Sequence, residues 1–227
     1  MATCNGETYL AEQLESIISQ LTDKDEIVIS DDHSEDQTLA VIGKFQEQFP
    51  HITVLQGPGQ GVGKNFEHAV MACSGDIICF SDQDDIWLEG KADVIRKEFA
   101  TDPSISVILH NGRHFDEGSG KMINRYQPGL LANILFSSYW GCCMAVRRDD
   151  IMQFLPVRTK KIIAHDQLIG AVSEKYRRTR FLDLNLIRHR VHGTNQTFKR
   201  PIPERIRFRL ELFREYRSCI RNRHRKA

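Results

Sequence analysis

Short apolar segments alternate with helix-like patterns along the first 110 residues, and this alternation constrains the fold more than any other feature. The helix-like patterns place apolar residues three or four positions apart, and the strand-like segments are runs of four or five residues rich in Ile and Val. Strands that alternate with helices predict a mostly parallel sheet covered by helices. We therefore predict an α/β fold. The predicted strands are 26–30, 52–55, 77–80 and 105–109, and the predicted helices are 10–21, 37–49, 65–73 and 91–100.

The start of the chain is short for a sheet of this type. Only Met1 to Cys4 precede the first predicted turn at Asn5-Gly6. An unpaired backbone group inside a core costs about 1–3 kcal/mol, so a missing strand would weaken its neighbours. We expect either a truncated first strand with two or three paired residues, or further strand-forming residues upstream.

The second half carries weaker patterns and a basic end. We expect strands at 139–146 and 181–190 around a helix at about 166–176, with a turn at 116–120. Net charge is +1 overall, but residues 200–227 carry +7 and the rest −6. We predict one domain over residues 1–198 and a basic helical tail over 199–227.

The tail has two interpretations. Its apolar residues recur at helical spacing between arginines, which fits either a basic amphipathic helix on anionic lipid or a helix packed on the domain. The tail contains no recognised nucleic-acid motif, so no nucleic acid is expected. The apolar residues are Ile206, Leu210, Phe213, Tyr216 and Ile220.

Cysteine spacing and hydropathy bear on where the protein works. None of the six cysteines forms a C-x-x-C pair, which predicts reduced thiols in a cytosolic protein. The sequence has no apolar run of about 18–20 residues and no signal-peptide pattern. We expect a cytoplasmic protein, with peripheral contact to the inner face of the cell membrane left open.

Two acidic clusters follow predicted strands, at Asp31-Asp32 and at Asp82-Gln83-Asp84-Asp85. Ligands of open parallel sheets bind beyond the carboxyl ends of the strands. Acids at such positions also serve as helix caps, which would explain Asp31 alone. Several carboxylates close together repel unless a cation neutralises them, and Mg²⁺ or Mn²⁺ bridges carboxylates to diphosphate oxygens. Two clusters therefore favour a divalent-cation site.

The glycine-rich segment 57–63 fits neither common phosphate-loop motif. The P-loop pattern fails at Pro58 and Asn65, and the dinucleotide pattern fails at Val62. We expect either a loop that brings its backbone close to another segment or a plain loop, with Asn65 as the cap of the next helix.

Several of these segments together resemble the family 2 glycosyltransferases, most closely the rhamnosyltransferase-like enzymes of bacterial surface-polysaccharide assembly. The similarity covers roughly residues 1–198 and is most specific through residue 88. The segments that carry it are 2–6 (ATCNG), 29–38 (ISDDHSEDQT), 61–67 (GVGKNFE), 75–88 (GDIICFSDQDDIWL), 140–142 (WGC), 164–166 (AHD) and 188–195 (RHRVHGTN).

The resemblance implies a GT-A fold, meaning a Rossmann-like, mostly parallel mixed sheet flanked by helices. It also implies an inverting reaction that transfers a sugar from a UDP- or dTDP-sugar to a saccharide or lipid-linked saccharide. Asp84 would bind Mn²⁺ or Mg²⁺, and His192 would contact the cation or the diphosphate. Asp166 would be the catalytic base. In the nucleotide-sugar site, Asp32 would bind the base and Asp82 would lie near the ribose. The other residues of this site would be Ala2, Thr3, Asn5, Asp31, Lys64, Asn65 and Gln83.

Two other functions remain open on the sequence. A sugar-phosphate nucleotidyltransferase shares the alternating architecture, but it needs a glycine-rich phosphate loop after the first strand, and residues 3–7 supply none. A degenerate transferase domain that serves as a binding module would fit the short first strand. The intact acidic clusters oppose this second alternative.

Overall fold

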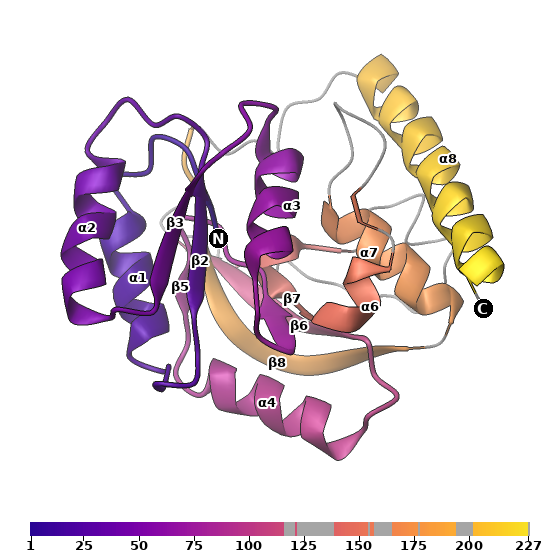
Figure 1. Cartoon of the computed structure of the whole chain (residues 1–227), viewed down its shortest axis with the longest axis horizontal. Coiled ribbons are helices and arrows are strands. Elements are labelled where there is room, and N and C mark those ends of the chain that lie inside the picture. The colour runs from indigo at the N-terminus through magenta and orange to yellow at the C-terminus, as the bar shows by residue number, and fades with distance from the viewer. Residues whose placement is uncertain are drawn as a thin grey trace.

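The computed structural model describes residues 1–115, 121, 139–153, 155–156, 165–176, 178–193 and 202–226 (Figure 1). The turn predicted at 116–120 lies outside these residues. None of the helices in the described part of the chain has the length and hydrophobicity needed to cross a bilayer.

The first half of the chain builds a parallel three-stranded sheet in the order β1-β2-β3. β1 is short, as expected, and pairs Ala2 with Ser30 and Thr3 with Asp31. In Figure 1, β2 and β3 lie between α1 and α2 on one side and α3 on the other. The elements are β1 (Ala2–Thr3), α1 (Leu10–Ile18), β2 (Ile27–Asp31), α2 (Thr38–Gln48), β3 (Ile52–Gln56) and α3 (Val62–Ala72).

The second sheet is mixed and has the order β4-β7-β6-β8-β5. Parallel pairing continues only between β6 and β8, while β4–β7, β6–β7 and β5–β8 are antiparallel. The second sheet is therefore mixed and mostly antiparallel, whereas the first sheet is entirely parallel. The strands are β4 (Ile77–Cys79), β5 (Ile86–Trp87), β6 (Val107–Phe115), β7 (Met144–Arg147) and β8 (Thr179–Arg190).

Two local predictions for this half need correction. The strand predicted at 139–146 begins only at Met144, because Gly141–Cys143 form a short 3₁₀ helix, η1, in front of it. β5 was not predicted, since two residues directly after an acidic run give too short a pattern to recognise.

The helices of the second half cover both faces of this sheet. Alternate residues of β6 point to opposite faces, so Val107 and Leu109 join the cluster that includes α7, while Ile108 packs with α4. The helices are α4 (Lys91–Thr101), α6 (Arg148–Met152), α7 (His165–Lys175) and α8 (Ile202–Lys226).

The basic tail is one long helix, α8, which packs beside α7 along the edge of the molecule opposite α2 (Figure 1). Phe208, Leu212 and Tyr216 enter the same hydrophobic cluster as α7. This packing fits the second interpretation of the tail, although a packed helix can still bind lipid with its outer face. The domain division at residue 198 stays a prediction.

Candidate active site

Asp31, at the end of β2, organises the first acidic turn. Its Oδ1 accepts hydrogen bonds from Thr3 Oγ1 at 2.8 Å and Ser34 Oγ at 2.6 Å, and its Oδ2 accepts one from Ser34 N at 2.9 Å. Asp31 is buried, so these donors offset the cost of removing its charge from water. Asp31 and Thr3 thus shape the turn that displays the next residue.

Asp32 faces the glycine-rich segment. Its Oδ1 accepts a hydrogen bond from Gly59 N at 2.6 Å, and Gly57 N donates to Asp31 O at 2.7 Å. A Cβ atom on Gly57 would lie 2.7 Å from Asp32 Oδ1, which is too close for any side chain. The close backbone approach predicted for this segment is therefore confirmed, and it surrounds the residue expected to bind the base.

Asn65 is not a helix cap, contrary to the prediction. α3 begins at Val62 after Gly61, whose φ of 88° suits a glycine. Asn65 lies buried inside the first turn, and its Nδ2 donates to Ser30 O at 2.8 Å and Thr3 O at 3.2 Å. It joins α3 to β1 and β2, and its role with a nucleotide stays a prediction. Lys64 beside it pairs with Glu67 at 2.8 Å.

The segment after β1 joins the two acidic turns. Asn5 Oδ1 accepts a hydrogen bond from Glu35 N at 2.8 Å on the first turn. Gln83 on the second turn pairs with the backbone of Cys4, accepting from its N at 2.8 Å and donating to its O at 3.1 Å. Ala2 is buried at the base of this segment. The predicted nucleotide-sugar residues therefore lie along one continuous edge.

The second acidic turn holds like charges close together. Burial, followed by the charges of Asp85 and Asp84, raises the pKa of Asp82 to about 8. Burial and the charge of Asp85 also raise the pKa of Asp84. Carboxylates in this state lack enough positive charge nearby, so the turn is electrostatically suited to a cation.

Asp84 and His192, the two predicted metal ligands, touch each other. His192 Nε2 lies 2.7 Å from Asp84 Oδ2, and both side chains are largely buried. A carboxylate and an imidazole are both ligand types that divalent cations accept, so this pair would suit Mn²⁺ or Mg²⁺ by its chemistry.

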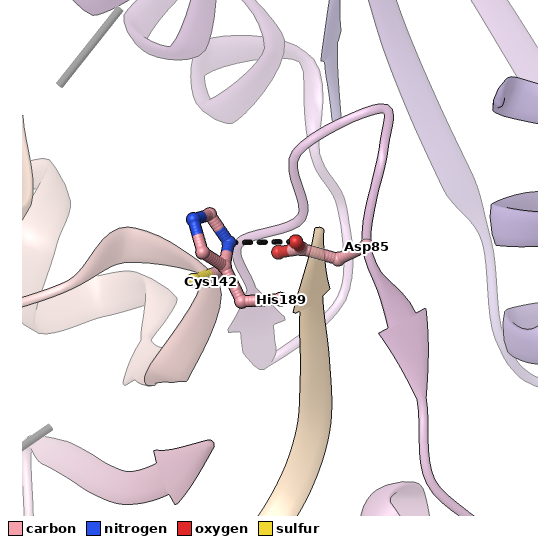
Figure 2. A group of neighbouring side chains, drawn as sticks. All are labelled: Asp85, Cys142 and His189. Carbon is pink, nitrogen blue, oxygen red and sulfur yellow. Dashed lines mark hydrogen bonds and ion pairs between the residues drawn. The ribbon is translucent and has the colours of Figure 1, made fainter. Parts of the chain in front are cut away.

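A buried group that was not predicted lies behind this pair. His189 Nδ1 lies 2.7 Å from Asp85 Oδ1, and Cys142 sits beside the imidazole ring (Figure 2). Burial opposes a charge on His189, but the contacts with Asp85 and Cys142 outweigh it and raise its pKa to about 12. A protonated imidazole next to Asp85 makes an ion pair between β8 and the acidic turn.

This group also has metal-binding chemistry. Among the described residues, Asp85, Cys142 and His189 are the one set of three whose ligand atoms all lie within 4.8 Å of one another. A thiolate in the set favours Zn²⁺ over Mg²⁺ or Mn²⁺. Because Asp85 Oδ1 already binds His189 and Arg190 N, we interpret the group as the anchor of the acidic turn.

Arg190 extends this anchor to α1. Its Nε donates to Asp84 O at 3.1 Å, and its guanidinium pairs with Glu12. The guanidinium also stacks 4.6 Å above the Tyr9 ring, and that ring lies 5.0 Å from the His192 ring. The end of β8 is thus held against both the acidic turn and the start of α1.

Asp166 lies in the first turn of α7. Its Oδ2 accepts a hydrogen bond from Gly141 N at 3.0 Å, and its Oδ1 accepts one from Gln167 N at 2.7 Å. Bonds to backbone N–H groups favour the ionised carboxylate. The charge of Asp166 also contributes to the raised pKa of Asp82, which places it near the acidic turn.

The predicted site residues other than Lys64, whose contact is with Glu67 on its own helix, therefore gather in one region built from both sheets. The residues that were missed are the partners of the acidic turn rather than its acids. The segment 188–195 signalled their region, but no local pattern indicated the individual pairings. The missed residues are Tyr9, Glu12, Cys142, His189 and Arg190.

Comparison with known proteins identifies this arrangement. The family model described as glycosyl transferase family 2 matches residues 1–155, more than half of the chain. The chain belongs to glycosyl transferase family 2. This match covers β1 through β7 and includes both acidic turns.

A curated relative of this family 2 member is the dTDP-rhamnosyl transferase RfbG of Shigella flexneri. The two are 33% identical over 165 residues, which is 68% of this chain and 56% of the relative. The chain thus spans just over half the length of that relative. The match supports the rhamnosyltransferase-like subgroup.

Solved glycosyltransferases share the fold at lower identity. The structure of Staphylococcus aureus TarS 1–349 in complex with UDP-GlcNAc matches with a TM-score of 0.73, 22% identity, 96% of this chain and 64% of that chain. Glucosyl-3-phosphoglycerate synthase of Mycobacterium tuberculosis, in complex with Mn²⁺, UDP and its product, matches with a TM-score of 0.62, 17% identity, 96% of this chain and 77% of that chain. The fold is therefore of the GT-A type.

Proposed function

We propose that this family 2 member is a metal-dependent, inverting hexosyltransferase. It moves a sugar from a UDP- or dTDP-sugar to a hydroxyl group of a saccharide or lipid-linked saccharide, in the cytoplasm, during surface-polysaccharide synthesis. The observation that carries the proposal is the contact of Asp84 with His192 in the acidic turn whose Asp82 feels the charge of Asp166. The dTDP-rhamnosyl relative and the UDP complexes of the structural neighbours support the donor class.

The first acidic turn binds the nucleoside of the donor. Asp32, presented beside Gly59, recognises the base through its carboxylate, while Thr3 and Asp31 keep the turn in shape. Asp82 contacts the ribose from the second turn. Gln83 keeps the two turns in register through its paired bonds to Cys4.

Asp84 and His192 would hold the divalent cation. A cation bound there would supply positive charge that stabilises the leaving nucleoside diphosphate. The two protein ligands are held before the donor arrives, because Asp85, His189 and Arg190 attach their backbone segments to each other. A preformed site loses less entropy when donor and cation bind.

Asp166 accepts the proton of the acceptor hydroxyl as that oxygen attacks the anomeric carbon. Its two backbone hydrogen bonds orient the carboxylate for this role. An inverting displacement places base and leaving group on opposite sides of the sugar. The proposed base comes from α7, whereas the proposed cation ligands come from the acidic turn and the segment just after β8.

Loss of the cation ligand tests the proposal. Asp84→Asn removes a charged ligand without emptying the core, so the variant should fold and lose Mn²⁺-dependent binding of UDP and dTDP in calorimetric titrations. Asp76→Asn, at an exposed position before β4, is the matched control and should keep wild-type binding. Unchanged metal dependence in Asp84→Asn would remove this residue from the cation site.

A donor screen separates the alternatives. Release of nucleoside diphosphate from a UDP- or dTDP-sugar, with a lipid-linked saccharide as acceptor, should require Mn²⁺ or Mg²⁺. Metal-dependent donor binding without turnover on any acceptor would instead favour a degenerate binding module. Formation of a nucleotide-sugar from a sugar phosphate and a nucleoside triphosphate would favour the nucleotidyltransferase.

A further inference from the structure

The long helix α8 has two faces of different character. Its inner face, with Phe208, Leu212, Tyr216 and Cys219, packs into the hydrophobic cluster around α7. Its exposed residues, at 3.6 residues per turn, fall mainly on the opposite face. These exposed residues are Pro203, Glu204, Ile206, Arg207, Leu210, Phe213, Arg214, Arg217 and Arg221.

The outer face combines large apolar side chains with arginines. Ile206, Leu210 and Phe213 are 58%, 56% and 43% exposed, and their spacing of four and three residues puts them in one stripe. Arg214 and Arg217 follow directly, and Arg217 lies 5.7 Å from the Phe213 ring. We define the outer face of α8 as Ile206, Arg207, Leu210, Phe213, Arg214, Arg217 and Arg221.

Acids contribute little to this face. Glu211 and Glu215 are half-buried and project toward the flank of the helix, where Glu211 pairs with Arg207 at 3.1 Å. Among the side chains of α8 that the structure describes, Glu204 is the one exposed acid, and it lies near the start of the helix. The outer face is therefore positive as well as apolar.

We propose that the outer face of α8 docks on an anionic membrane surface. Arginines of such a face attract the negative lipid headgroups, while the exposed Ile, Leu and Phe side chains enter the boundary of the acyl region. A nucleic acid would use the arginines but leave the aliphatic side chains in water. A second copy of this chain would bring the four arginines of each outer face together, and this like charge opposes pairing.

The docking helix is attached to the helix that carries the proposed base. Arg209 Nη1, on the flank of α8, donates to Gln167 Oε1 at 2.9 Å, and Gln167 follows Asp166 in the first turn of α7. A membrane under α8 would therefore lie on the same side of the molecule as α7. This placement suits an acceptor whose lipid stays in the bilayer, a consequence that rests on the proposed function.

Vesicle sedimentation tests the docking. The 227-residue chain is mixed, without donor or divalent cation, with vesicles of phosphatidylcholine alone or with about one-third phosphatidylglycerol. Binding should require the anionic lipid and weaken with added salt. Arg214→Glu with Arg217→Glu should lower the partition coefficient by at least about twentyfold, since each arginine near an anionic surface contributes about fivefold.

A second variant and its control test the apolar stripe. Leu210→Glu with Phe213→Glu should also abolish sedimentation, whereas Leu39→Glu, at an equally exposed leucine of α2, should not. Equal melting temperatures confirm that the variants fold. Asp84→Asn should sediment like the wild type, so the docking and the proposed catalysis fail independently.

Three outcomes would overturn the proposal. The first is equal binding of the α8 variants and the wild type to anionic vesicles. The second is a concentration-dependent dimer in sedimentation velocity that Leu210→Glu dissociates, because the outer face would then be covered by a second copy. The third is binding to duplex nucleic acid without binding to either vesicle.

Discussion

The two acidic turns differ in where their partners come from. The turn after β2 is held by partners from the first sheet and its own loop, since Asp31 binds Ser34 and Thr3, which are 3 and 28 positions away. The turn after β4 is held by the end of β8 and the residues just after it, with Asp85 bound to His189 and Asp84 to His192 over 104 and 108 positions. The first acidic turn can therefore form with the first sheet, whereas the second acidic turn needs the second sheet to be complete.

The two turns also differ in charge compensation. Asp31 receives neutral hydroxyl and backbone donors, and it needs no further partner. The second turn holds three carboxylates whose mutual repulsion is only partly offset by His189 and His192. The donors around Asp31 thus satisfy the first turn, whereas the second turn keeps uncompensated negative charge, as expected if it is the proposed cation site. Substitutions in the two turns should consequently have separable effects.

The largest effect is expected at the proposed base, which belongs to neither turn. Asp166→Asn removes the proton acceptor, and turnover should fall by about 10²–10⁴-fold. Donor affinity and metal dependence should hardly change, because both turns remain intact. Steady-state release of nucleoside diphosphate and calorimetry measure the two quantities.

The matched control is Asp149→Asn, an exposed acid in the first turn of α6. It should keep wild-type turnover. An Asp166→Asn variant with near-wild-type turnover would exclude Asp166 as the base, and a parallel loss of donor affinity would place it on the donor side instead.

The next largest effect is expected for the Asp85–His189 pair, which anchors the second acidic turn to β8. Asp85→Asn leaves a buried protonated His189 without its counter-charge, and the free energy of unfolding should fall by about 3–5 kcal/mol. Mn²⁺-dependent binding should weaken because the turn loosens from β8. Urea denaturation and metal titration measure these changes, with Asp23→Asn at an exposed position as control.

A double substitution separates stability from site geometry. Replacing both members by apolar residues, Asp85→Leu with His189→Phe, removes the buried charges together and should recover much of the lost stability. Cation binding should stay weak, since the specific attachment is gone. Recovery of both properties would show that the pair serves packing alone.

A smaller effect is expected in the first acidic turn. Asp31→Asn turns one of its oxygens into an N–H group that faces the donors Thr3 and Ser34, which should cost about 1–3 kcal/mol. Base recognition at Asp32 should weaken while Mn²⁺ binding in the absence of nucleotide stays unchanged. Equal losses in both titrations would contradict the separation of the two turns.

The same difference explains what the sequence could predict. The acids themselves follow strand-like segments, so Asp31, Asp32 and Asp84 could be assigned to a strand-end site from local pattern alone. Their long-range partners could not, because nothing in the sequence near Asp85 indicates that His189 closes a loop of 104 residues. Asn65 was misassigned for a related reason, since a cap and a buried cross-link use the same residue type.

The two sheets also differ in how well their elements could be predicted from the sequence. Helices and strands of the first sheet were predicted within a few residues, because their apolar periodicity continues over whole elements. The second sheet was harder, since β5 has only two residues and η1 interrupts the approach to β7. Pairing order in that sheet depends on contacts between distant strands, which periodicity does not encode.

The smallest predicted effect lies at the joint between the two sheets. Glu26, directly before β2, accepts hydrogen bonds from Ser74 N at 2.6 Å, Ser74 Oγ at 2.9 Å and Gly75 N at 2.9 Å, in the turn that leads to β4. Burial raises the pKa of Glu26, but these bonds outweigh it and hold the pKa below its usual value.

A lowered pKa in the folded state fixes the direction of the pH effect. The ionised Glu26 contributes its full stabilisation above the ordinary glutamate pKa of 4.5, and the contribution disappears as pH falls through the lowered folded value. Glu26→Gln should therefore lower the melting temperature by about 2–4 °C at pH 7, corresponding to about 1 kcal/mol. The difference from the wild type should shrink below pH 4.5, whereas the exposed Glu15→Gln should show none at either pH. A Glu26→Gln difference that persists unchanged at low pH would mean that the joint depends on the shape of the side chain and not on its charge.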